Sequence, residues 1–244
     1  MDIDLRRKYI DDFTNLIFSK YFYRLVLEKK YIENFGDIEL NRMRKIYDTM
    51  IINKKLEATF FMPQESSVTS ENLLEYNARK EYFDLERQIL ELEENIKKND
   101  KEIKELTFYL SKNIKDRMEM LVSRTSPLIN KNSKAVSLWT GFNKALEDAN
   151  WKRVFNLSSK AKEIRLLKTK DNEGELLKEI ENIKEQEKKM RRIYPFNQEE
   201  ILENEEILEE KILAGQKDLK GVEESYLRMA DYYLSSTQTP RWYS

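Results

Sequence analysis

The stretch YFDLERQILELEENIKKNDKEIKELTFYL, residues 82–110, carries the pattern that decides the fold. Apolar residues recur in it at alternating steps of three and four, which is the spacing that aligns side chains along one side of an α-helix. The seam positions are Tyr82, Leu85, Ile89, Leu92, Ile96, Asn99, Ile103, Leu106 and Leu110. This stretch therefore predicts a long helix that lies along another helix.

The composition predicts that helices also fill most of the remaining chain. Its 244 residues include only 5 glycines and 4 prolines, so few turns are available. Charged residues make up 36% and hydrophobic residues 40%, a balance typical of long-helix proteins. We expect an all-α fold, an elongated helical bundle with an antiparallel coiled-coil arm and a small aromatic-rich helical head.

Turn residues divide the predicted helices into four segments. Residues 1–62 form a helical hairpin, the head, in which Gly36 ends the first helix with a left-handed cap. Residues 63–123 contain the long coiled-coil helix, which we expect to be unbroken to Val122. Residues 124–234 form a helical bundle that completes the coiled coil, and residues 235–244 form a flexible tail.

The charges beside the long seam indicate which helix covers it. Its flanking e and g positions carry no base, so a parallel homodimer would lack the Glu–Lys pairs that usually fix register. The helix that starts near Leu176 offers Lys184 and Arg191 beside its own seam. An antiparallel partner from the same chain is therefore favoured, with a homodimer as the alternative. Asn99 either sets the alignment of the helices or faces solvent where the coil ends.

The absence of two residue types excludes several classes of site. The chain has no Cys, which removes disulfides, thiolate zinc sites and cysteine nucleophiles. It also has no His, which removes the most common general base and imidazole ligands for metals. We therefore predict no catalytic residue, no cofactor and no metal site, and we expect a protein that is not an enzyme.

The N-terminal region predicts a protein outside membranes. Its most apolar stretch, residues 13–27, carries Lys20 and Arg24 and is too short to span a bilayer. Asp2 and Asp4 stand where a signal peptide would carry bases. We expect a cytoplasmic protein with no membrane partner.

Aromatic side chains are the predicted contacts with another protein, because aromatic residues dominate interface hot spots. Tyr21 and Tyr23 lie on the first helix, and Trp242 and Tyr243 lie in the tail. These residues favour a non-catalytic adaptor or scaffold subunit that binds another protein in a larger assembly. An alternative is a coiled-coil chaperone that clasps client proteins between its arms.

A basic stretch offers a second alternative, a nucleic-acid-associated regulator. Its bases could contact phosphates while Trp151 and Phe155 stack on bases. The residues concerned are Lys152, Arg153, Lys160, Lys162, Arg165 and Lys168. The same bases could instead form a solvated helix face that pairs with the glutamates of residues 199–210.

Two charge clusters flank Pro195. Basic residues between 188 and 192 precede it, and the glutamates that begin at Glu199 follow it. Opposite charges are favoured at the C-terminus of one helix and the N-terminus of the next. We expect the two clusters to meet across the Pro195 turn.

Overall fold

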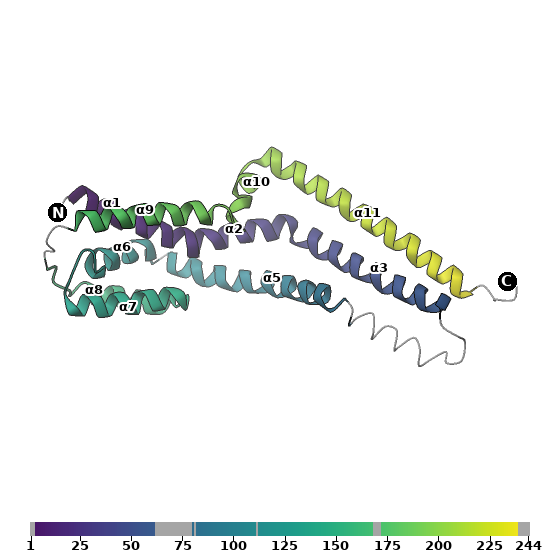
Figure 1. The fold of residues 1–244 in the computed structure, drawn as a ribbon, viewed down its shortest axis with the longest axis horizontal. Coiled ribbons are helices and arrows are strands. Elements are labelled where there is room, and N and C mark those ends of the chain that lie inside the picture. Colours follow the sequence, from purple (N-terminus) through teal and green to yellow (C-terminus); the bar gives the residue numbers. More distant parts are fainter. Residues whose placement is uncertain (1–2, 62–79, 81, 111, 168–171, 239–244) are drawn as a thin grey trace. The chain divides into compact units, whose positions relative to one another are not determined.

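The computed structural model describes residues 3–61, 80, 82–110, 112–167 and 172–238 (Figure 1). All regular structure in these ranges is helical, which confirms the all-α fold class. In chain order the elements are α1 (Ile3–Phe18), η1 (Ser19–Tyr23), α2 (Arg24–Tyr31), η2 (Ile32–Gly36), α3 (Asp37–Phe61), α5 (Phe83–Leu110), α6 (Ile114–Thr125), α7 (Ser133–Glu147), α8 (Trp151–Ala161), α9 (Glu173–Met190), η3 (Phe196–Gln198), α10 (Glu199–Glu203) and α11 (Glu205–Gln238).

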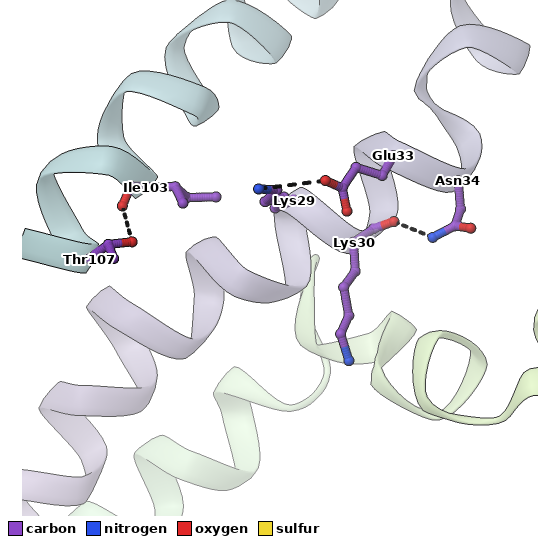
Figure 2. A network of polar contacts seen from close by, with 6 residues as sticks. All are labelled: Lys29, Lys30, Glu33, Asn34, Ile103 and Thr107. Atoms are coloured by element: carbon purple, nitrogen blue, oxygen red, sulfur yellow. Dashed lines mark hydrogen bonds and ion pairs between the residues drawn. The ribbon is translucent and has the colours of Figure 1, made fainter. Parts of the chain in front are cut away.

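The first five elements follow one another without an intervening turn. Gly36 does not end a helix, because it closes the π-helical turn η2 and Asp37 continues in the right-handed helical region. The hairpin predicted for the head is therefore wrong. Figure 2 shows local polar contacts beside this turn, where the Asn34 amide donates to the Lys30 carbonyl at 2.7 Å and Lys29 pairs with Glu33.

The long helix predicted up to Val122 is interrupted. α5 ends at Leu110, and Asn113 has a left-handed φ of 55° immediately before α6 begins. Asn accepts this conformation more readily than most residues. Within α5, the Thr107 hydroxyl donates a hydrogen bond to the backbone carbonyl of Ile103 (Figure 2). A loop then separates α6, which ends at Thr125, from α7, which begins at Ser133.

The chain packs into two compact units. Unit 1 contains residues Met1–Glu28 and Asp100–Glu199, and unit 2 contains Lys29–Asn99 and Glu200–Ser244. Each unit combines stretches that are distant in the sequence, whereas the four predicted segments follow sequence order. The helix α11 continues to Gln238, so the first residues of the predicted flexible tail are helical.

Unit 1 has the larger buried core. Its elements α1, η1, α6, α7, α8 and α9 contribute side chains that are almost fully excluded from solvent. These include Tyr9, Phe22, Met118, Phe142 and Ile183. The burial of such apolar side chains is the dominant favourable contribution to folding.

The helix α9 packs against α1 in unit 1, which corrects the partner predicted for it. Leu176, Ile180 and Ile183 are buried in the same core as the α1 side chains. The two helices run parallel, since Tyr9 lies near Glu179 while Leu16 and Met190 line a common groove further along. The prediction that α9 covers the seam of α5 is therefore wrong.

In unit 2, α3 and α11 form a parallel pair. Three contacts show the direction, because Gly215 lies beside Ile38, Arg42 pairs with Asp218, and Lys45 lies over the Tyr226 ring at 4.2 Å. The side of α11 that carries Leu208, Ile212, Leu219 and Val222 is half-buried. The antiparallel arrangement expected for the coiled coil is therefore not the arrangement of α3 and α11.

The part of the α5 seam up to Asn99 faces protein in unit 2. Glu93 pairs with Arg44 of α3, and Ile96 lies beside Gly36, so α5 runs antiparallel to α3. Ile89 is buried, and Asn99 is only 6% exposed. The solvent-facing alternative for Asn99 is therefore wrong. The partner from the same chain is α3 with its preceding turn, rather than the helix at Leu176.

Candidate protein-binding groove

An open groove of about 490 Å³ lies on unit 1. It is formed where α1 ends, where the π-helical turn η1 leads into α2, and where α9 ends before η3. Its lining residues are Leu16, Lys20, Tyr21, Arg24, Gln186, Lys189, Met190, Ile193, Tyr194 and Phe196. Most of the exposed lining is apolar, and a volume of this size lies in the range of about 300–1,000 Å³ found for ligand pockets.

Tyr21 is the predicted contact residue that lies in this groove. It belongs to η1, and its ring packs edge-on against Trp151 with 5.6 Å between ring centroids. Burial raises the pKa of the Tyr21 hydroxyl, and the negative charge of Glu147 raises it further, while Arg24 opposes the change. The side chain is half-buried, so it presents part of its surface from a fixed position.

Tyr23 does not line this groove, and its role in binding a protein stays a prediction. Its hydroxyl donates to Glu199 Oε1 at 2.8 Å, and its ring lies 6.4 Å from that of Phe196. Arg191 contacts the other oxygen of Glu199 at 3.4 Å. Tyr23 therefore holds the turn between α9 and α10, and the two charge clusters flanking Pro195 do meet, as predicted, through Arg191 and Glu199.

The groove has one wall that is unusually exposed. Ile193 is 59% exposed, and Tyr194 is also exposed, whereas Phe196 beside them is buried. These three residues follow the end of α9 and are fixed by the contacts of Tyr23 and Arg191 with Glu199. The wall thus combines exposed apolar surface with a backbone anchored at both ends.

The rim of the groove carries three bases and no acid among its lining residues. Arg24 pairs with Glu28 at 2.9 Å, and Lys189 lies 3.9 Å from Glu185. Lys20 lies 5.4 Å from the centre of the Tyr21 ring and has no carboxylate partner among the described residues. The groove lining therefore presents three cationic side chains, of which Lys20 is without such a carboxylate in the described part of the chain.

The basic stretch lies on α8 and on the loop that follows it. The bases at 152, 153, 160, 162 and 165 are exposed, and within the described ranges none of them forms an ion pair. The aromatic rings are not available for stacking on bases. Trp151 is buried against Phe22 at 4.6 Å, and the Arg117 guanidinium covers Phe155 at 3.6 Å. The predicted stacking role of the two rings is wrong.

Three predicted contact residues cannot be placed. Lys168, Trp242 and Tyr243 lie outside the described residues. Their proposed roles stay predictions.

Other kinds of site can be considered only for the described part of the chain. There, no group of three or more His, Cys, Asp or Glu side chains is arranged to hold a metal ion. None of the described helices carries an apolar stretch long enough to cross a membrane. The comparisons give no further assignment, since the chain matches no protein-family model, no curated protein and no solved structure.

Sequence reasoning missed the half of the groove that α9 contributes. Met190 and Tyr194 were interpreted as seam positions of the helix that starts near Leu176, and Ile193 as its end, with no binding role for the three. A usable signal was present, because Ile193 and Tyr194 are apolar residues placed between a basic cluster and a proline. Large apolar side chains in a turn that ends a helix have no helical neighbour to bury them.

Proposed function

We propose that this protein is a non-catalytic adaptor or scaffold subunit that binds another protein through the groove beside Tyr21. The observation that carries the proposal is the groove itself, which combines an apolar floor with an anchored wall that exposes Ile193. Concave apolar sites with a few polar groups at the edge are the usual form of binding sites. Fixed aromatic side chains at the centre of such surfaces contribute most of the binding energy.

The predicted location in the cytoplasm belongs to this proposal. The coiled-coil description also belongs to it, with α5 and the pair α3 and α11 as the candidate coiled-coil helices. In this proposal these helices extend the scaffold, while unit 1 supplies the contact.

Site-specific photo-crosslinking in the source cells tests the proposal. A photoreactive amino acid replaces Ile193, which is exposed in the groove wall. The matched control carries the same amino acid at Val136 on α7, which is 41% exposed and does not line the groove. We expect one protein to be crosslinked from position 193 and not from position 136.

The identified partner is then tested in binding measurements with the full chain. Ile193→Ser removes exposed apolar surface without disturbing the core, and we expect it to weaken binding about tenfold or more, a change of about 1.4 kcal/mol. Val136→Ser should leave the affinity unchanged. Equal crosslinking from both positions, or equal affinity of the two variants, would show that the groove is not the contact surface.

A nucleic-acid-binding role is the second candidate, supported by the exposed bases on α8 that have no ion pair among the described residues. Such a site would act through phosphate contacts, whose strength falls steeply with salt. The test is the binding of single- and double-stranded probes at several salt concentrations, compared with the triple variant Lys160→Glu, Lys162→Glu and Arg165→Glu. Unchanged binding by the variant excludes this candidate.

A further inference from the structure

We infer that the groove on unit 1 takes an acidic amphipathic segment of the partner, with apolar side chains on the floor and carboxylates against the rim. This inference rests on the proposed function and specifies the chemistry of its partner. Two features of the groove carry it, namely the apolar floor and the positions of the three bases around it.

The floor determines that the bound segment presents apolar side chains. Leu16, Met190 and Phe196 form its base, and Tyr21 and Ile193 form its edges. Met190 is unbranched and polarizable, so it can adapt to side chains of different shapes. A volume of about 490 Å³ leaves room for more than one partner side chain.

The rim determines the charge of that segment. Lys20 belongs to η1 and Arg24 to α2, whereas Lys189 belongs to the end of α9, so the bases come from the different elements that form the groove. A neutral segment bound between them would remove water from these cations without replacing it, which is unfavourable. Carboxylates on both edges of the segment would compensate this loss and give the complementarity that selects the partner.

The ion pairs already formed by the rim do not oppose this exchange. The pair of Lys189 with Glu185 involves two solvent-exposed side chains, and such a pair contributes only about 0–1 kcal/mol. Arg24 pairs through Nη1 with Glu28, whose side chain is only 17% exposed, and the guanidinium has further N–H groups that can donate to a partner. Lys20 has no carboxylate to give up among the described residues. Partner carboxylates can therefore pair with Lys20 and Lys189 at little cost, while Arg24 keeps Glu28.

The shape of the site favours a helical peptide segment over a lipid surface. An amphipathic helix carries an apolar stripe at i, i+3, i+4 and i+7 with polar residues on both sides, which matches a floor between two basic edges. A membrane surface is broad and nearly flat on this scale.

Selection from a displayed library of randomised amphipathic peptides tests the inference with the full chain as bait. Peptides are kept when they bind the natural protein and lose binding to Ile193→Ser, which changes the groove wall without altering any charge. The kept peptides are then measured on the double variant Lys20→Glu with Lys189→Glu. We expect these groove-dependent peptides to be enriched in Asp and Glu on both sides of an apolar stripe. Their affinity should fall about tenfold or more in the double variant.

Matched controls separate this inference from the proposed function. Lys134→Glu changes an exposed base of α7 outside the groove and should alter affinity less than about twofold. Groove-dependent peptides without an excess of acids would overturn the acidic segment and leave the proposed function standing. If the library yields no groove-dependent peptide although crosslinking from position 193 succeeds, the inference of an acidic segment is also overturned. Charge-dependent binding to vesicles of phosphatidylserine and phosphatidylcholine in place of peptides would assign the groove to lipid.

Discussion

The buried hydrogen bond between Tyr9 and Ser126 gives the sharpest test of the unit 1 core. The two hydroxyl oxygens lie 3.0 Å apart, and both residues are buried. Tyr9→Phe removes the tyrosine hydroxyl and leaves the Ser126 hydroxyl without its partner. Removing one partner of a buried hydrogen bond lowers the free energy of unfolding by about 1–3 kcal/mol. Removing both partners lowers it by less than the sum of the two single changes.

The ionisation of Tyr9 gives a second measure of the same contact. Burial raises the pKa of Tyr9 to about 12, and the charge of Glu179 adds to this, while the Ser126 hydrogen bond acts in the opposite direction. The unfolded chain titrates near 10.0, so it loses the proton first as the pH rises. The contribution of Tyr9 to the free energy of unfolding is therefore fully present below pH 10 and is lost as the pH rises from 10 to about 12. The loss amounts to about 2–3 kcal/mol.

Denaturant unfolding followed by tryptophan fluorescence measures both effects, because Trp139 and Trp151 lie in unit 1. Single variants Tyr9→Phe and Ser126→Ala, and the double variant, complete a cycle. We expect each single change to lower the free energy of unfolding by about 1–3 kcal/mol at neutral pH, with a positive coupling. The control is Tyr232→Phe, an exposed residue of α11 that should change it by less than about 0.5 kcal/mol.

Two results would refute this reasoning. The first is a Tyr9→Phe variant as stable as the natural protein at neutral pH. The second is a pH dependence above pH 10 that is the same with and without the Tyr9 hydroxyl. Because lysines titrate in the same interval, only the difference between the two proteins reports Tyr9.

Three further predictions concern packing in the two units. Gly221→Ala should raise the stability of unit 2 by about 0.5–1 kcal/mol, since its new Cβ meets nothing within 4 Å. Gly215→Leu should lower the stability of unit 2 by about 1–3 kcal/mol, because a Cβ there already lies 3.3 Å from Ile38. Thermal unfolding followed by helical circular dichroism compares the two variants. Asn130→Ala should cost unit 1 at least about 2 kcal/mol in denaturant unfolding, because this buried amide bonds two backbone carbonyls and two backbone N–H groups. Phe142→Ala should cost about 3–5 kcal/mol in the same assay, since the ring is fully buried.

The helices were predictable from the sequence because their apolar spacing is a local property. The seam of α5 identifies the face that packs, and Ile89 and Asn99 on that face are buried. Asn150 and Asn132 also show local signals, since their side chains accept hydrogen bonds from the first turns of α8 and α7. Such caps depend on residues within one helical turn, so one sequence suffices to find them.

Helix pairing was not predictable from charge. Lys184 and Arg191 beside the α9 seam suggested that α9 pairs with α5, whose flanking positions are acidic or neutral. Exposed charges, however, contribute little to which helices pack together. The apolar side chains of α9 decide its position, and they are buried against α1. In the structure Arg191 pairs instead with Glu199, eight residues further along the chain.

The parallel pairs were missed for a topological reason. Short turns join antiparallel helices, so the sequence order of predicted helices and turns suggests antiparallel neighbours. In this chain α1 with α9 and α3 with α11 are parallel pairs, and more than a hundred residues separate the two members of each pair. A connection of that length leaves no local signal, because the intervening helices form their own contacts.

The groove depends on the least predictable local feature, the π-helical turn η1. An α-helix rotates about 100° per residue, so the wider turn shifts the faces of all following side chains relative to α1. With this shift Phe22 is buried and stacks on Phe18 at 5.1 Å, and Tyr21 lies at the groove beside Trp151. Residues Ser19–Tyr23 contain no glycine or proline that would mark the turn. The aromatic contacts that hold η1 come from other helices, so the position of Tyr21, and with it the binding surface we propose, is set by tertiary packing.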